Sequence, residues 1–422
     1  MAGRCLLGLA ACAATSTSEP AAPQAPVAAS AAAAPSAASA PNGAGAPAAR
    51  APGASAPAAA PASAGAPPAF ATVVKDARRI DGLLPLWQKD DKLWFELRPD
   101  DFNKPLFLSP KLSQGIGEQA LFGGAMLGLQ FGGRPQIVEF RRQHNQVMLV
   151  ARNQRFLAPP GSPEARSVAS AFSDSLLGSA AVASQPQPES KAVLVDANAI
   201  FLTDLMGLAN QLQRTYRQNY AFDARNSAFT RVRAEADAVM LELSLHFATA
   251  GLLVAPPTQT PGTPVPTVPS TLPDPRSMFL GLHYTLASLS EHPLAPRRAD
   301  PRVGYFDTTV YDFGNDGARS PARHYVRHWR LEKKDPAAAL SEPVRPITFW
   351  LDRDVPLKYR DTITRGVLAW NAAFERIGFK DAIVVRQQPD DAAFDTLDLR
   401  VASIRWVTNA EPAWGAIGPS HV

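Results

Sequence analysis

Residues 13–69 consist almost wholly of alanine, proline, serine and glycine, and this run sets a firm limit on what can fold. Such small side chains cannot bury enough apolar surface to offset the conformational entropy that is lost on folding. The run therefore predicts a disordered tether. We expect globular structure from about residue 70 to residue 422, which is enough chain for two or three domains.

The residues before the tether are typical of an export signal. Arg4 precedes a short apolar stretch that is too brief to span a bilayer. The sequence LAAC, which ends at Cys12, resembles the lipobox of bacterial lipoproteins, where the signal is cleaved before the cysteine and the thiol is lipid-modified. We expect residues 1–12 to direct export to the periplasm or outer membrane, with Cys12 as a lipid anchor. The alternative is a plain secretory signal with an incidental cysteine.

Charge and cysteine content narrow the classes of function. The chain has 42 basic and 38 acidic residues, a near balance that argues against a nucleic-acid partner. Its two cysteines, Cys5 and Cys12, both precede the tether. The folded part therefore has neither a disulfide nor thiolate chemistry.

Three folded regions are predicted, in an α+β fold. Apolar runs around the turns at 88–92 and 141–146 indicate two β-hairpins in a β-rich accessory domain at 70–158. A helical run at 204–216 and two alternating runs, at 239–247 and 278–286, indicate a mixed α/β accessory domain at 159–342. Its Pro/Thr-rich stretch 255–275 is expected to be a solvent-exposed loop.

The region 343–422 changes to an α/β pattern. It predicts a strand at 347–351, a helix that ends at Gly378, and strands at 383–385 and about 397–406. This is the beginning of an α/β layer without a second helix to cover it. The apolar stripe of the predicted helix consists of Ile363, Val367, Trp370, Phe374 and Ile377.

This last region resembles the opening of the catalytic domain in a bacterial family of large zinc-dependent metalloproteases related to the metzincins. The resemblance is carried by RPITFWLDRDVPLKYRDTITRGVLAWNAAFERIGFKDAIVV, LRVASIRWV and AWGAIGPSHV. GLLPLWQKDDKLWFEL, DPRVGYF and HYVRHWRLEKKDP resemble the accessory regions that precede that domain. The resemblance implies an incomplete metzincin-like domain at 343–422, and hydrolysis of peptide or protein substrates by zinc-activated water in the intact protein.

The resemblance also implies that substrate binds as an extra antiparallel strand along the edge of the sheet. An open edge can pair with any extended peptide. The residues that match this edge strand are Trp414, Gly415, Ala416, Ile417 and Gly418. The alternative is an ordinary covered edge or loop, because glycine weakens a strand.

Zinc hydrolysis in such enzymes needs the motif HExxH, which supplies two ligands and a general base. None of the seven histidines is followed by glutamate, so no metal or catalytic residue can be assigned. We expect a truncated, inert fragment, with zinc only in the intact protein. The competing hypothesis is a complete, non-enzymatic cell-envelope protein that binds a peptide, a partner or the cell wall.

Two histidine pairs were weighed as metal sites. His324 and His328 have the spacing of the motif, but they lie in a strand pattern that separates them by about 13 Å, among arginines typical of a solvated face. His246 and His283 lie on the polar faces of the two alternating runs, and they could meet if those strands pair in register. The alternative is two exposed, unrelated histidines.

Other motifs carry little weight. Residues 115–120, GIGEQA, mimic a dinucleotide-binding loop, but they lack a βαβ context and are expected to form a flexible loop. Neither a G-x-S-x-G elbow nor a P-loop occurs, so serine-hydrolase and nucleotide-hydrolase assignments have no starting residue.

Overall fold

The computed structural model describes residues 66–125, 136–258 and 262–410, which belong to one unit, Ala64–Val422. These residues are mostly β, with 36% strand and 14% helix. The predicted lipidation site Cys12 and the predicted edge strand Trp414–Gly418 lie outside the described residues. Within the described ranges, every helix is too short or too polar to cross a membrane.

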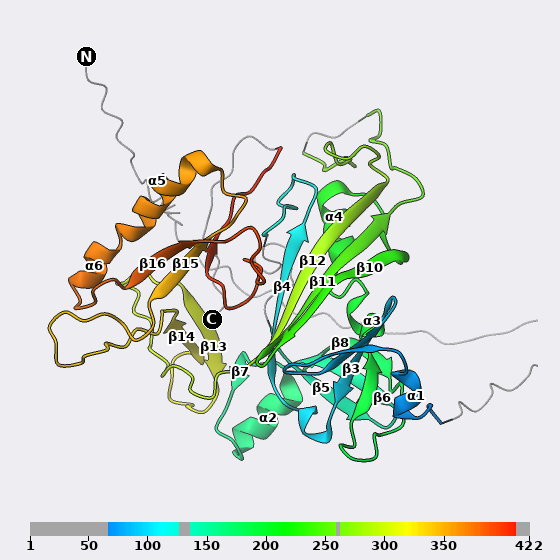
Figure 1. The fold of residues 1–422 in the computed structure, drawn as a ribbon, viewed down its shortest axis with the longest axis horizontal. Coiled ribbons are helices and arrows are strands. Elements are labelled where there is room, and N and C mark those ends of the chain that lie inside the picture. Colours follow the sequence, from blue (N-terminus) through cyan, green and yellow to red (C-terminus); the bar gives the residue numbers. More distant parts are fainter. Residues whose placement is uncertain (1–65, 126–135, 259–261, 411–422) are drawn as a thin grey trace, which may run out of the picture. The chain divides into compact units, whose positions relative to one another are not determined.

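A curled, half-barrel sheet of seven antiparallel strands dominates the structure (Figure 1). The sheet joins a block of three strands from the middle of the chain to a block of four earlier strands, because β12 pairs with β4. In spatial order the strands are β10 (Ala221–Glu235), β11 (Ala238–Ala248), β12 (Ser277–Ser288), β4 (Leu106–Gln114), β5 (Gln136–Gln143), β6 (Gln146–Ala151) and β8 (Ser175–Ala181).

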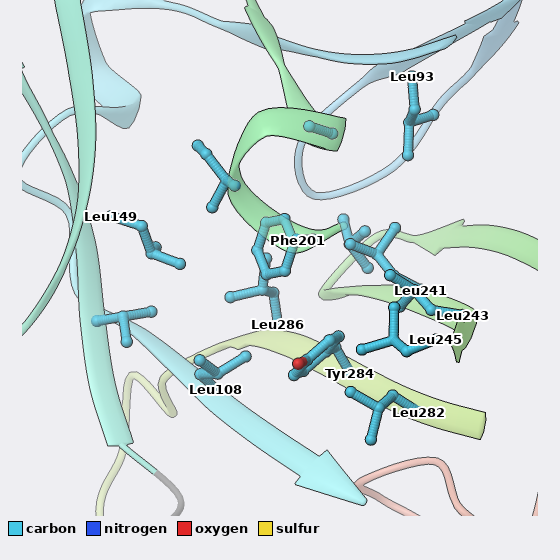
Figure 2. Packing of buried hydrophobic residues seen from close by; sticks show 14 of the residues in the cluster. Leu93, Leu108, Leu149, Phe201, Leu241, Leu243, Leu245, Leu282, Tyr284 and Leu286 are labelled. Carbon is cyan, nitrogen blue, oxygen red and sulfur yellow. The ribbon is translucent and has the colours of Figure 1, made fainter. Parts of the chain in front are cut away.

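One face of this sheet supplies the main core. Alternate residues of β11 and β12, such as Leu241 and Leu282, are fully buried, as the alternation predicted. Leu108 of β4 and Phe201 of helix α3 (Ala197–Phe201) pack in the same cluster (Figure 2). Each such side chain contributes about 1.5–3 kcal/mol when it leaves water. The sheet and its core therefore cross the boundary expected at residues 158–159.

A second sheet contains the first predicted hairpin. Its strands are β1 (Arg78–Ile80), β2 (Leu86–Lys89), β3 (Lys92–Leu97) and β9 (Val193–Asp196), in that order. Asp90 takes a positive φ in the tight turn between β2 and β3. The second predicted hairpin is also confirmed, as β5 and β6.

The remaining helices of the first 300 residues are short. They are α1 (Phe70–Val73), a 3₁₀ turn η1 (Pro99–Asp101), α2 (Pro163–Ala171) and α4 (Leu208–Tyr216). The predicted helical run from 204 begins only at Leu208, because the Asp204 carboxylate accepts hydrogen bonds from the backbone N–H groups of Leu208 and Ala209 at 2.6 and 2.9 Å.

A three-stranded sheet joins distant parts of the chain. Its order is β14 (Ala322–Val326), β13 (Asp307–Asp312) and β7 (Phe156–Leu157). The strand pattern expected through residues 325–331 ends at Val326, so only His324 of the predicted histidine pair lies in a strand.

The last region forms a small parallel β-α-β unit. Strand β15 (Ile347–Leu351) lies between β16 (Ile383–Gln387) and β17 (Ser403–Ile404), and helices α5 (Leu357–Leu368) and α6 (Asn371–Glu375) connect β15 to β16 (Figure 1). A metzincin domain is not evident in the described part of this region.

Two details of this unit differ from the expectation. The predicted strand 397–406 is regular only at Ser403–Ile404, because Asp395 and Asp398 accept backbone hydrogen bonds that fold the preceding residues into a turn. The predicted single helix is divided between α5 and α6. Its apolar stripe is not a buried face, since Trp370 and Ile377 are each 65% exposed.

Candidate functional site

A row of ionisable side chains crosses four neighbouring strands on the sheet face opposite the core. The strand register places Arg231 beside Glu242, Glu242 beside His283, and His283 beside Lys111. Successive side chains of a strand point to opposite faces of the sheet. Glu242 alternates with the core residues of β11, so it lies on the face opposite the core. We call these four residues the ionic row.

Residues 393–398 cover the ionic row. Lys111 Nζ donates a hydrogen bond to the carbonyl oxygen of Leu397 at 2.5 Å. Asp398 Oδ1 lies 3.2 Å from His283 Nε2 and accepts a hydrogen bond from Arg233 Nη2 at 2.6 Å. His283 is fully buried, and Lys111 and Asp398 are each 8% exposed. Charges at this depth are stable only when partners of opposite sign lie beside them.

The electrostatics of the cluster follow from burial and pairing. Burial lowers the pKa of Lys111 to about 8, although the nearby Asp398 opposes that shift. Burial by itself raises the pKa of Asp398, but hydrogen bonds from His283 and Arg233 outweigh it and bring this pKa to about 2. At neutral pH the Asp398 carboxylate is therefore an anion among cationic and imidazole groups.

A second buried carboxylate ties the β-α-β unit to the same region. Asp352, which follows β15, lies 3.0 Å from Arg405 Nη1 and accepts a hydrogen bond from the Thr396 hydroxyl. The guanidinium of Arg405 lies against Gly124, where a Cβ would approach its Nε to 3.0 Å. Gly124 also has φ +92°, a conformation that other residues rarely adopt.

The structure does not bring His246 and His283 together. In the β11–β12 register His246 is opposite Phe279, and His283 is opposite Glu242, four residues away along the strand. That offset corresponds to about 13 Å. The register on which a shared metal site depended does not occur, and the alternative of two exposed histidines is wrong, because both side chains are buried.

The other histidine pair is separated as well. His324 Nδ1 lies 3.3 Å from Asp307, whereas His328 Nδ1 contacts the carbonyl oxygen of Trp329. Across residues 66–125, 136–258 and 262–410, three or more His, Cys, Asp or Glu side chains nowhere group in a way that could hold a metal ion.

The GIGEQA segment is an anchored turn rather than a flexible loop. Glu118 is buried and accepts hydrogen bonds from Tyr216 Oη at 2.7 Å and from the backbone N–H of Ser270 at 3.1 Å. Ser270 belongs to the Pro/Thr-rich loop 255–275, which was expected to be solvent-exposed. One end of that loop is therefore fixed to the GIGEQA turn and, through Tyr216, to helix α4.

Sequence reasoning singled out His283 but missed the other residues of the buried cluster. Lys111 offered one signal, since a charge in the apolar run LFLSPKLSQ is unusual. Asp398 and Arg233 offered none, because they are 165 residues apart and meet only through the tertiary structure.

Comparison with known proteins identifies part of this region. Residues 131–334 match a family model described as a domain of unknown function, DUF5117. No curated protein and no solved structure matches the chain. The match includes Arg231, Glu242 and His283 but neither Lys111 nor Asp398. The site thus joins the matched domain to residues before and after it.

Proposed function

We propose that the chain is the N-terminal part of an exported zinc-dependent metalloprotease. The sequence from Arg345 resembles the start of that catalytic domain, and its described residues fold as a parallel β-α-β unit. In this proposal the unit is the beginning of a metzincin-like domain. Peptide or protein substrates and an envelope location follow from the same resemblance and from the export signal.

The observation that carries the proposal is the buried cluster that joins the β-α-β unit to the sheet. Asp398 inserts between Arg233 and His283, while Arg405 connects Asp352 to the loop at Gly124. Buried ion pairs require fixed geometry, so they position one element against another. The sheet region then acts as an accessory domain that holds the first strands of the protease domain.

Zinc is implied by the resemblance, but the residues of this chain do not fit it. HExxH has no counterpart in the printed sequence, and the described residues form no group that could ligate a metal. We therefore assign no ligand, catalytic residue or catalytic step to this chain. In the complete enzyme, zinc would supply the activated water for peptide-bond hydrolysis.

The test begins with the gene. The reading frame beyond codon 422 should encode a helix that contains HExxH and a third ligand. The longer polypeptide should then bind one zinc per chain and cleave casein, whereas residues 1–422 should do neither. A continuation that lacks this helix would overturn the proposal and leave a non-enzymatic envelope binding protein as the better hypothesis.

A further inference from the structure

A second polar cluster lies on the same face of the sheet as the ionic row, at the start of β12. His246 Nε2 is 2.8 Å from the hydroxyl of Ser277, and His246 Nδ1 is 3.0 Å from Asp223 Oδ2. The imidazole thus connects a hydroxyl on one side to a carboxylate on the other. We propose that Ser277 is a reactive nucleophile that accepts acyl groups from activated esters.

The proposal rests on the order of the three groups. A serine hydroxyl is a weak nucleophile until an adjacent base takes its proton, and the base works best when a third group orients it. Here Nδ1 faces Asp223, which favours the tautomer that carries its proton on Nδ1 and directs the lone pair of Nε2 at Ser277. This arrangement is recognised by geometry and not by position in the sequence.

The local backbone is built around this contact. Asp223 is directly opposite His246 in the β10–β11 ladder, and the register shifts between Asp223 and Ala228. In this irregular stretch, Ser227 Oγ accepts a hydrogen bond from the His246 backbone N–H at 2.9 Å and donates one to the Asp223 carbonyl at 2.7 Å. Irregular strand geometry of this kind often serves to aim a side chain.

The carboxylate is held as well as the ring. Asn226 Nδ2 donates a hydrogen bond to Asp223 Oδ2 at 2.6 Å, and the Arg225 backbone N–H donates one to Oδ1 at 3.1 Å. The bond from Asn226, followed by that from His246, lowers the pKa of Asp223. Asp223 is therefore ionised at neutral pH and can stabilise an imidazolium.

The surroundings of Ser277 suggest the class of ester. Ser277 is half-buried, so part of the residue is open to solvent. The ring of Phe279 lies 4.7 Å from the imidazole and is 47% exposed, which provides an apolar surface next to the nucleophile. Small aryl esters and short-chain acyl esters fit this combination of an apolar surface and an open approach.

The chemical step balances without a further reactant. Ser277 Oγ attacks the carbonyl carbon of the ester and forms a new C–O bond, while its proton passes to His246 Nε2. The bond to the leaving alcohol breaks, and His246 returns the proton to the alcohol oxygen. The product is an O-acyl serine. This step needs no metal, so it is independent of the proposed protease function.

The test uses the full chain and a fluorophosphonate probe, with the labelled peptide identified by mass spectrometry. Ser277 should be labelled in the native chain and much less after heat denaturation. Asp223→Asn and His246→Gln should slow labelling at least tenfold while circular dichroism remains native, because base assistance contributes about 10²–10⁴-fold. Equal labelling of native and denatured chain at Ser277, or no labelling at excess probe, would overturn the proposal.

The structure offers a matched control. Thr309 Oγ1 contacts His324, which also lies near Asp307, but both contacts involve the same ring nitrogen, Nδ1. In that trio the hydroxyl and the carboxylate face the same nitrogen, so the carboxylate cannot orient one ring nitrogen while the other takes the hydroxyl proton. Thr309→Ala should therefore leave the labelling of Ser277 unchanged. Folded Asp223→Asn and His246→Gln chains that label at the native rate would show that the cluster has only a structural role.

Discussion

Asp398 is the residue at which the buried cluster can be tested most directly. Its carboxylate is the anion between Arg233 and His283, and its side chain is 11% exposed. Asp398→Ala removes the hydrogen-bonded partner of the Arg233 guanidinium, which keeps only the longer 3.7 Å ion pair with Glu235, and it opens the contact between residues 393–398 and the sheet. The depression of the Asp398 pKa from 3.8 to about 2 corresponds to about 2 kcal/mol of unfolding free energy.

That contribution has a definite dependence on pH. A carboxylate whose pKa is lower in the folded state stabilises the fold above its unfolded pKa, and the contribution is lost as pH falls through the folded value. It is thus complete at pH 7 and is lost between about pH 4 and 2. Removing one partner of a buried pair also strands the other charge, so we expect a total loss of about 3 kcal/mol in Asp398→Ala.

The assay is urea unfolding of the full chain at pH 7, monitored by tryptophan fluorescence. Hydrogen exchange of residues 393–400 serves as a local readout. Asp300→Ala is the control, because Asp300 also forms an ion pair with an arginine, Arg302, but at the surface. It should shift the midpoint far less, since exposed pairs contribute little. If Asp398→Ala shifts the midpoint no more than Asp300→Ala, the cluster does not hold the two regions together.

Three further predictions concern other parts of the chain. The pKa of Lys111 is about 8 in the folded chain and 10.5 in the unfolded chain, so the free energy of unfolding should rise by about 3 kcal/mol as the pH increases from 8 to 10.5. Urea titrations of Lys111→Met should not show this rise. Gly124→Ala should destabilise the chain by more than about 1 kcal/mol, because Arg405 and the positive φ exclude a Cβ, whereas Gly251→Ala, with open space around it, should be close to neutral in the same assay. The mature polypeptide should begin at a lipid-modified Cys12, and a mass spectrum with an unmodified N-terminus would remove the anchor from the proposal.

Several elements could be predicted from the sequence because their signals are local. The alternation of β11 and β12 and the hairpin turn at Asp90 lie within runs of a dozen residues, where side-chain period and turn chemistry act directly. The order of strand, helix and strand that begins at β15 was predictable for the same reason, whereas its parallel pairing is seen only in the structure. Local patterns did not specify how far each element extends, as the short strand Ser403–Ile404 shows.

The charged side chains that meet are brought together by the pairing of strands that lie far apart in the sequence. The register of β12 against β4 set Lys111 beside His283, and the turn at Asp398 covered them both. The pairing of β11 with β10 and β12 placed His246 between Asp223 and Ser277 and not beside His283. The physical reason is that period fixes the face on which a side chain lies, whereas the pairing of distant strands fixes its neighbours. A buried charge acquires its pKa, and a hydroxyl its base, from those neighbours alone.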